Sequence, residues 1–180
     1  MKKLSLLLVL ALLPFLGSAQ SIFDKFEDMD HVTSISINKG LIKLAGDVAS
    51  LDRENQEAQD FAELSRGLSG IKVFVTEDAN ISQDMHKTVS KYLKSSSMEE
   101  LMRVKDKEAN VKFYIKQGRD ENHVRELLLF VSDINNKNIE IGNRKFESVL
   151  VSLTGDIDLN KISALTKQMN LPKELNEAGR

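Results

Sequence analysis

The sequence contains no cysteine, and this absence excludes several classes of protein. Without cysteine there is no disulfide framework and no thiolate chemistry. A lipid-modified N-terminal cysteine is excluded for the same reason. The folded chain must therefore be stabilised by an ordinary apolar core.

Motifs that concentrate reactive groups are also missing. No Gly-x-Ser-x-Gly elbow occurs, and no Ser-x-x-Lys stands in a usable context. Gly67 and Gly70 are not followed by the Gly-Lys-Ser/Thr of a phosphate-binding loop. The three histidines, His31, His86 and His123, do not stand at metal-ligand spacing. We therefore expect no cofactor and no metal site.

One stretch resembles the opening of a calcium loop, with Asp156, Asp158 and Asn160 at alternate positions. An EF-hand also needs glycine at its sixth position and glutamate at its twelfth. Lysines 161 and 167 stand there instead, and a lysine repels the cation. A turn followed by a helix cap is the better interpretation, since a carboxylate at Asp158 can accept hydrogen bonds from the first helical turn.

The first nineteen residues are typical of a secretory signal. Lys2 and Lys3 precede an apolar run over residues 4–16, and small residues at 17–19 predict cleavage before Gln20. The run is too short to serve as a permanent membrane span. No second run approaches that length, so we expect no transmembrane segment in the mature chain.

The charge balance argues against nucleic acid as a partner. The formal net charge is −2, and removal of the two leader lysines makes the chain more acidic. A mildly acidic protein is not attracted to polyanions in general, although a local basic patch remains open.

In the first half, strands are predicted at residues 32–37 and 71–76 from their β-branched composition. Residues 21–29 predict a short amphipathic helix that caps the core. Helical segments are expected at residues 41–46 and 51–66. Because about thirty residues of helix separate the two strands, a crossover connection would make them parallel.

A third helix is predicted to begin at residues 80–82, with Ser82 as its cap. Its inward side would carry Met85, Val89, Tyr92 and Leu93.

The second half predicts strands with short connections, which favours an antiparallel meander. They are expected at residues 100–105, 110–117, 124–132, 139–141 and from 146 onward. In the second of these, Val111, Phe113 and Ile115 should face the core, and Lys112, Tyr114 and Lys116 the solvent.

The segment 146–169 is the clearest scaffold signal. Val149, Val151 and Leu153 fall on one side of a strand, with Phe146 and Leu150 on the other, which predicts cover on both faces. Residue Gly155 is expected to turn the chain into a helix capped by Asp158. That helix would bury a stripe and end before Pro172; the stripe is Leu159, Ile162, Leu165 and Met169.

Together these elements predict one α+β domain over residues 20–180, after a signal peptide at 1–19. The expected architecture is a mostly antiparallel sheet of about five to six strands with helices packed on one face.

Several of these segments carry a family resemblance, most of all Leu-Thr-Gly-Asp-Ile-Asp-Leu at 153–159. The leader, Phe-Asp-Lys-Phe at 23–26, and the strands at 32–37 and 71–74 contribute as well. The chain resembles the exported domain-of-unknown-function family four-two-five-two, found mainly in Bacteroidetes. The resemblance covers essentially the whole mature chain. It implies location and fold only, and the lipoprotein cysteine of many members is missing here.

A cluster of basic residues in and around one predicted hairpin suggests a partner-binding patch. Tyr114 would lie between two lysines on its outward face. The alternative is edge protection, because outward lysines stop a sheet edge from pairing with another molecule. The candidate residues are Arg103, Lys105, Lys107, Lys112, Tyr114, Lys116 and Arg119.

The functional hypothesis is a non-catalytic exported binding or scaffolding protein of the cell envelope, periplasmic or envelope-associated and not lipid-anchored. Its partner would be an envelope protein or an anionic envelope component. The alternative is an exported hydrolase whose acidic or His/Asp groups converge only in the fold.

Overall fold

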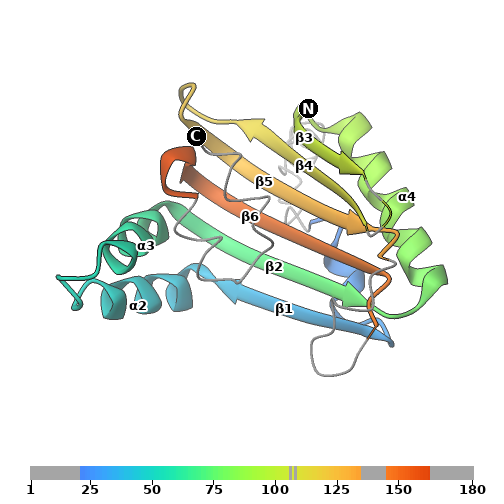
Figure 1. The fold of residues 1–180 in the computed structure, drawn as a ribbon, viewed down its shortest axis with the longest axis horizontal. Helices are drawn as coiled ribbons and strands as arrows, with labels where there is room; N and C mark the ends of the chain where they lie inside the picture. The colour runs from blue at the N-terminus through green and yellow to red at the C-terminus, as the bar shows by residue number, and fades with distance from the viewer. Residues whose placement is uncertain (1–20, 106, 108, 135–144, 163–180) are drawn as a thin grey trace, which may run out of the picture.

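The computed structural model describes residues 21–105, 107, 109–134 and 145–162, and its centre is one antiparallel sheet. The strand order is β1-β2-β6-β5-β4-β3 (Figure 1). The strands are β1 (Val32–Asn38), β2 (Leu68–Thr76), β3 (Met98–Lys105), β4 (Asn110–Gln117), β5 (His123–Ser132) and β6 (Ser148–Asp158). The helices are η1 (Asp24–Phe26), α2 (Lys39–Ala49), α3 (Gln56–Gly67), α4 (Ala79–Ser95) and η2 (Leu159–Lys161). The predicted α+β class and mostly antiparallel sheet of about five to six strands are confirmed. The predicted packing of helices on one face alone is wrong, because helix side chains enter buried clusters on both faces.

The last strand of the chain, β6, lies in the middle of the sheet. It pairs with β2 on one side and with β5 on the other, both antiparallel. Val151 and Leu153 face one cluster of buried residues, and Leu150 faces the other. The two-sided burial predicted for this segment is therefore confirmed.

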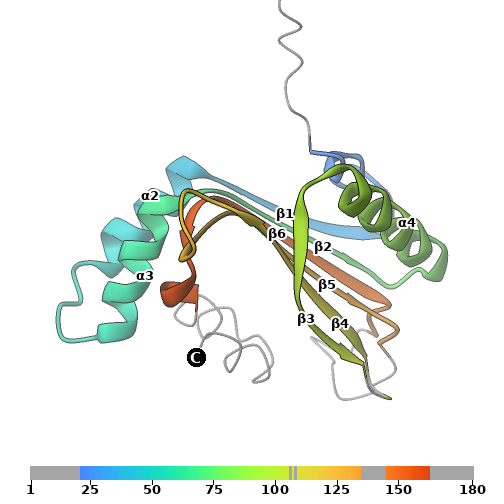
Figure 2. The same ribbon diagram turned by 90° about the horizontal axis from the view of Figure 1, so that it is seen from above.

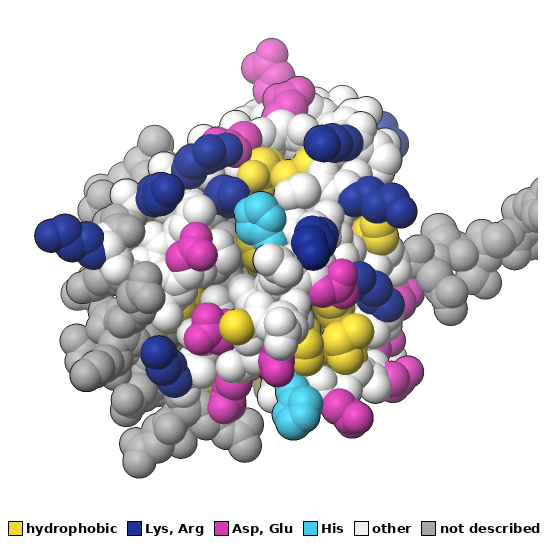
Figure 3. Space-filling model, turned by 90° about the vertical axis from the view of Figure 1, so that its right-hand side faces the viewer, with side chains coloured by type: hydrophobic (Ala, Val, Ile, Leu, Met, Phe, Trp, Pro, Cys, Tyr) yellow, Lys and Arg dark blue, Asp and Glu magenta, His cyan; other side chains and the backbone are white. Residues whose placement is uncertain are grey.

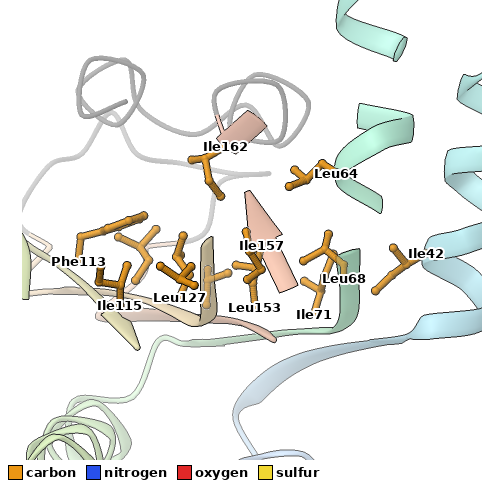
Figure 4. Packing of buried hydrophobic residues seen from close by; sticks show 13 residues of the cluster. Ile42, Leu64, Leu68, Ile71, Phe113, Ile115, Leu127, Leu153, Ile157 and Ile162 are labelled. Atoms are coloured by element: carbon orange, nitrogen blue, oxygen red, sulfur yellow. The ribbon is translucent and has the colours of Figure 1, made fainter. Parts of the chain in front are cut away.

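The sheet buries apolar side chains on both faces. Figure 4 shows part of the larger cluster, in which side chains of β4, β5, β6 and β2 meet Ile42, Leu64 and Ile162. The smaller cluster lies on the opposite face and consists of Phe23, Phe26, Phe74, Met85, Val89, Tyr114, Leu128, Phe130 and Leu150.

The helices are divided between these two clusters. α4 and η1 supply side chains to the smaller cluster, and in Figure 2 α4 runs along that face. α2 and α3 form a pair at one end of the sheet. This pair packs against the larger cluster through Ile42 of α2 and Leu64 of α3. Phe23 and Phe26 are almost fully buried, so the N-terminal segment caps the core as predicted.

The parallel arrangement predicted for the first two strands is wrong. β1 and β2 are antiparallel neighbours, with Val32 opposite Thr76 and Asn38 opposite Gly70. The intervening α2 and α3 pack against each other and return the chain to the end of the sheet from which it left. A helical hairpin therefore replaces the expected crossover.

The turn predicted at Gly155 is also wrong, because β6 continues through this residue to Asp158. Gly155 has a φ of 144°, and a Cβ there would lie 2.2 Å from the carbonyl oxygen of Gly67. The glycine is needed for close backbone approach to β2. Asp158 ends the strand opposite His123. The predicted helix beyond residue 162 lies outside the described residues, as does the short strand predicted at 139–141.

The cap of α4 is Asp78 and not Ser82. The Asp78 carboxylate accepts hydrogen bonds from the backbone N–H groups of Asn80 and Ile81. These two bonds hold the pKa of Asp78 below its usual range. The Ser82 hydroxyl instead forms a 2.5 Å hydrogen bond with that of Ser148. The helix predicted for this segment is therefore confirmed, whereas the predicted cap is wrong.

Tyr114 faces a core and not the solvent. Its alternation with Phe113 and Ile115 was predicted correctly, but its side chain is only 7% exposed in the smaller cluster. The prediction assumed that one face of the sheet is open to water, whereas helices cover part of that face too.

Within the described residues, no helix is long and apolar enough to cross a membrane.

The close approach at Gly155 yields a stability prediction. Gly155→Ala places a methyl group against the Gly67 carbonyl and strains the backbone, so it should lower the free energy of unfolding by about 2–4 kcal/mol in urea denaturation. Gly40→Ala, in the first turn of α2, is the control and should change it by less than about 1 kcal/mol. Equal effects of the two substitutions would show that the approach at Gly155 is not a constraint.

Candidate functional site

The most unusual surface of the described structure is the outer side of α2. Leu41, Leu44 and Val48 are 53%, 60% and 60% exposed, and Leu51 just beyond the helix is 77% exposed. Their spacing of three, four and three residues places them along one side of the helix. Figure 1 shows that the α2–α3 pair extends beyond the end of the sheet. We call these four residues the α2 stripe.

The opposite side of α2 packs against the core and against α3. Ile42 is buried in the larger cluster, and Gly46 lies against α3. A Cβ at Gly46 would be 1.8 Å from the Ser65 hydroxyl oxygen, so the two helices are in close contact there. The α2 stripe is therefore additional to the apolar residues that attach the helix to the sheet.

Charged groups beside the stripe neutralise each other. Lys43 and Asp47 form an exposed ion pair of 2.8 Å across one turn of α2. Such a pair contributes little to stability, but its two charges cancel each other beside the stripe. The sequence reasoning placed a helix here and missed the surface. The available signal was that residues 41–48 hold apolar side chains on two sides of a helix, more than one core face can bury.

The structure brings together only part of the basic patch predicted from the sequence. Arg103 on β3 forms a bidentate ion pair with Glu100, at 2.9 and 2.6 Å. Lys112 lies opposite Arg103 in the ladder, and Tyr114 lies opposite Glu100. The hydrogen bond from Arg103 keeps the pKa of Glu100 below its usual range. Glu100 therefore balances part of the positive charge.

The remaining patch residues lie apart from this group. Lys105 ends β3, and Lys116 lies opposite Glu126 of β5. Arg119 and Asp120 lie in the turn between β4 and β5. The Arg119 guanidinium is 3.5 Å from the Asp120 carboxylate and 3.4 Å from the carboxylate of Asp156 on β6. Figure 3, which faces the α4 side of the molecule, shows basic and acidic side chains together on that side, with small apolar areas between them. Partner binding by the patch stays a prediction.

His123 is the histidine with the most polar contacts. Its Nδ1 lies 2.7 Å from an Asp120 carboxylate oxygen, and its Nε2 lies 2.7 Å from an Arg119 guanidinium nitrogen. A carboxylate only accepts and a guanidinium only donates, so Nδ1–H donates while the Nε2 lone pair accepts. Both ring nitrogens are engaged, which leaves no lone pair for a general base. The sequence signal for the contact between His123 and Asp120 was an aspartate three residues before the histidine.

The other two histidines are distant from this turn in the chain. His31 has a φ of 62° just before β1. The ring of His86 lies 5.8 Å from that of Phe130, centroid to centroid. Over the ranges that the structure describes, no three His, Cys, Asp or Glu residues converge to hold a metal ion.

A shallow hollow of about 290 Å³ opens beside the first residues of β1. It is lined by His31, Val32, Thr33, Val75, Glu77 and Phe146. Its volume lies at the lower limit of small-molecule sites, which range from roughly 300 to 1,000 Å³.

The most buried acidic side chain described is Glu126, which is 8% exposed. The Tyr92 hydroxyl of α4 donates a 2.5 Å hydrogen bond to its carboxylate. Burial raises the pKa of Glu126, and the Tyr92 bond and the charge of Lys116 oppose this rise. The pKa of Tyr92 is also raised, by burial and by the Glu126 bond and charge. The pair fixes α4 to β5 and is enclosed by the fold.

This pair leads to a prediction about pH. Because the folded-state pKa of Glu126 is raised, its ionisation costs stability as pH rises through that pKa. Glu126→Gln removes the ionisation and should lose less stability than the wild type between pH 4 and pH 8, measured by urea denaturation. Tyr92→Phe leaves the buried carboxylate without its donor and should cost about 1–3 kcal/mol at pH 7. Parallel pH curves for Glu126→Gln and the wild type would contradict the assignment.

Comparison with known proteins places this chain in a family. A family model for a domain of unknown function, DUF4252, matches residues 26–165, a range that includes all six strands. No curated protein and no solved structure matches the chain. Because the matched range is well over half of the 180 residues, the chain belongs to the DUF4252 family.

Proposed function

We propose that this protein is an exported binding or scaffolding protein that inserts α2 into an apolar groove of a partner protein in the cell envelope. The observation that supports this function is the α2 stripe, which exposes three large aliphatic side chains on α2 and a fourth just beyond its end. Contiguous exposed apolar surface of this kind marks interaction sites.

The spacing of the stripe matches a known mode of recognition. An amphipathic helix that lies in a groove presents anchors at positions i, i+3, i+4 and i+7. Leu41, Leu44, Ala45 and Val48 stand at those positions, and all four are exposed. Full burial of a leucine or valine side chain is worth roughly 1.5–3 kcal/mol. Several such anchors can therefore offset the entropy cost of association.

The charges around the stripe favour a protein over a lipid surface. Helices that bind anionic membranes carry an excess of lysine and arginine beside the apolar face. Here the Lys43 charge is matched by Asp47 on the next turn. The partner is therefore a protein groove lined by apolar side chains, with a rim of low net charge.

Export is part of the proposal and rests on the leader at residues 1–19. If the leader is cleaved as proposed, the protein isolated from its native cells should begin at Gln20, which intact-mass measurement can verify. A mass that includes Met1 would contradict cleavage.

The partner surface is tested by charge substitutions in the stripe. Leu44→Glu with Val48→Glu should reduce capture of the envelope partner at least tenfold, because two carboxylates would be buried in an apolar groove. Leu101→Glu is the matched control, since Leu101 is 52% exposed on β3, far from the stripe in the strand order. Capture is measured by cross-linking pull-down, and binding is then repeated with the purified partner.

Two further measurements separate the rival surfaces. Hydrogen exchange in α2 should slow in the complex, whereas Lys112→Glu with Lys116→Glu should leave capture unchanged. Loss of capture only in the lysine variant would assign binding to the basic patch. Binding of the protein to anionic phospholipid vesicles, abolished by the stripe substitutions, would replace the protein partner with a membrane.

A further inference from the structure

The two outer strands of the sheet differ sharply in how they are protected. β3 carries Glu99, Glu100, Arg103 and Lys105, and its pairing with β4 is interrupted by a shift between Glu100 and Met102. Charges and bulges are the usual devices that stop an edge strand from pairing with another molecule. The β3 edge is therefore guarded.

The β1 edge has neither device. Its sequence, Val-Thr-Ser-Ile-Ser-Ile-Asn, contains no charged residue and no proline. Its register with β2 runs in unbroken steps over all seven residues, from Val32 to Asn38. Residues 33–36 are exposed, and Ile35 is 48% exposed. An uncharged edge strand with an uninterrupted register is a template for a further strand.

We propose that two copies of this protein pair through β1, antiparallel to each other, and so join their sheets into one continuous sheet. This inference goes beyond the proposed function and uses a different surface. The twofold axis would be perpendicular to the sheet, because only that axis makes the two β1 strands antiparallel and keeps each face on its own side.

The register follows from the length and pattern of the strand. All seven residues find partners only when Ile35 lies opposite Ile35 of the second copy, which sets Thr33 opposite Ile37. Ile35 also lies opposite Val73 within its own sheet, so the new pair extends a row of β-branched side chains. On the other face, Ser34 lies opposite Ser36, and their hydroxyl groups are compatible.

Charges at the two ends of β1 favour a second copy over an unrelated peptide. In this register Asn38 lies opposite Val32 of the other copy, which brings Lys39, exposed at the start of α2, near His31 of the other copy. The exposed Asp30 is the next residue along, so each end of the interface brings a lysine close to an aspartate. The twofold axis repeats this match at both ends. A peptide partner would need to supply both charges by chance, whereas this chain carries them at the required positions.

The dimer leaves the α2 stripe available. α2 begins where β1 ends and leads away from the sheet, as Figures 1 and 2 show. Because the new interface consists of one added strand pair, its area is below the roughly 1,600 Å² of a standard interface. A monomer–dimer equilibrium with a dissociation constant on the order of 10 µM is expected.

The first test is sedimentation equilibrium of the purified protein from about 1 to 500 µM, a range that brackets the expected constant. The wild type should change from monomer to dimer across it. Ile35→Lys should weaken association at least tenfold, whereas Leu101→Lys, the same kind of change on the guarded β3 edge, should not. Leu44→Glu with Val48→Glu should leave the dimer intact, so that failure of the proposed function and failure of the dimer are distinguishable.

The second test measures the register and does not depend on a disruptive variant. The chain has no cysteine, so each introduced thiol is unique. Ile35→Cys should cross-link to itself efficiently with a short bismaleimide. Thr33→Cys should not, because in this register the two copies of residue 33 are about 13 Å apart along the strands.

Three results would overturn the proposal. They are a monomer throughout the concentration range, a dimer insensitive to Ile35→Lys, and cross-linking at residue 33 that equals or exceeds cross-linking at residue 35.

Discussion

The fold depends on the insertion of β6 between β2 and β5. This strand pairs along its length with both neighbours, so it joins the N-terminal half, which ends in α4, to the β3–β4–β5 meander. Leu150 and Val151 are both nearly inaccessible to water, one on each face of the sheet. A central strand with two apolar faces requires cover on both sides, and this requirement explains the division of the helices between two clusters.

Ionic contacts hold the N-terminal segment on the smaller cluster. Lys72 of β2 lies 2.5 Å from Asp24 and 2.8 Å from Glu27, with all three side chains largely shielded. These contacts raise the pKa of Lys72 even though burial opposes the rise. The polar side chains that reach partly buried positions, including Glu126 and Lys72, are thus used to attach helices to the sheet. The surfaces proposed for recognition are instead apolar or uncharged: one side of α2 and the edge of β1.

Local pattern was sufficient for most strands and for the fold class. Residues 110–117 were predicted as a strand with the bounds that β4 has, because alternation of apolar and polar residues is a property of neighbouring positions. The run predicted as a strand at 124–132 forms β5, which begins one residue earlier, at His123. The candidate site was predicted less well, since the basic patch was chosen from sequence proximity, whereas the fold separates Arg119 from Arg103 and pairs each with an acidic group.

What the sequence determined by itself is most of the described strands, the alternation of side chains along them and the absence of cysteine chemistry, because each of these depends on composition or on spacing of a few residues. The tertiary structure alone decided which strands are neighbours, which surfaces stay exposed and which glycine is indispensable. From the sequence alone Gly155 is predicted to be a turn, and only its contact with β2 shows that it lies within a strand. Tyr114 is likewise predicted to be exposed, and only the smaller cluster shows that it is buried. Both depend on segments distant in the chain, whose approach no local pattern records.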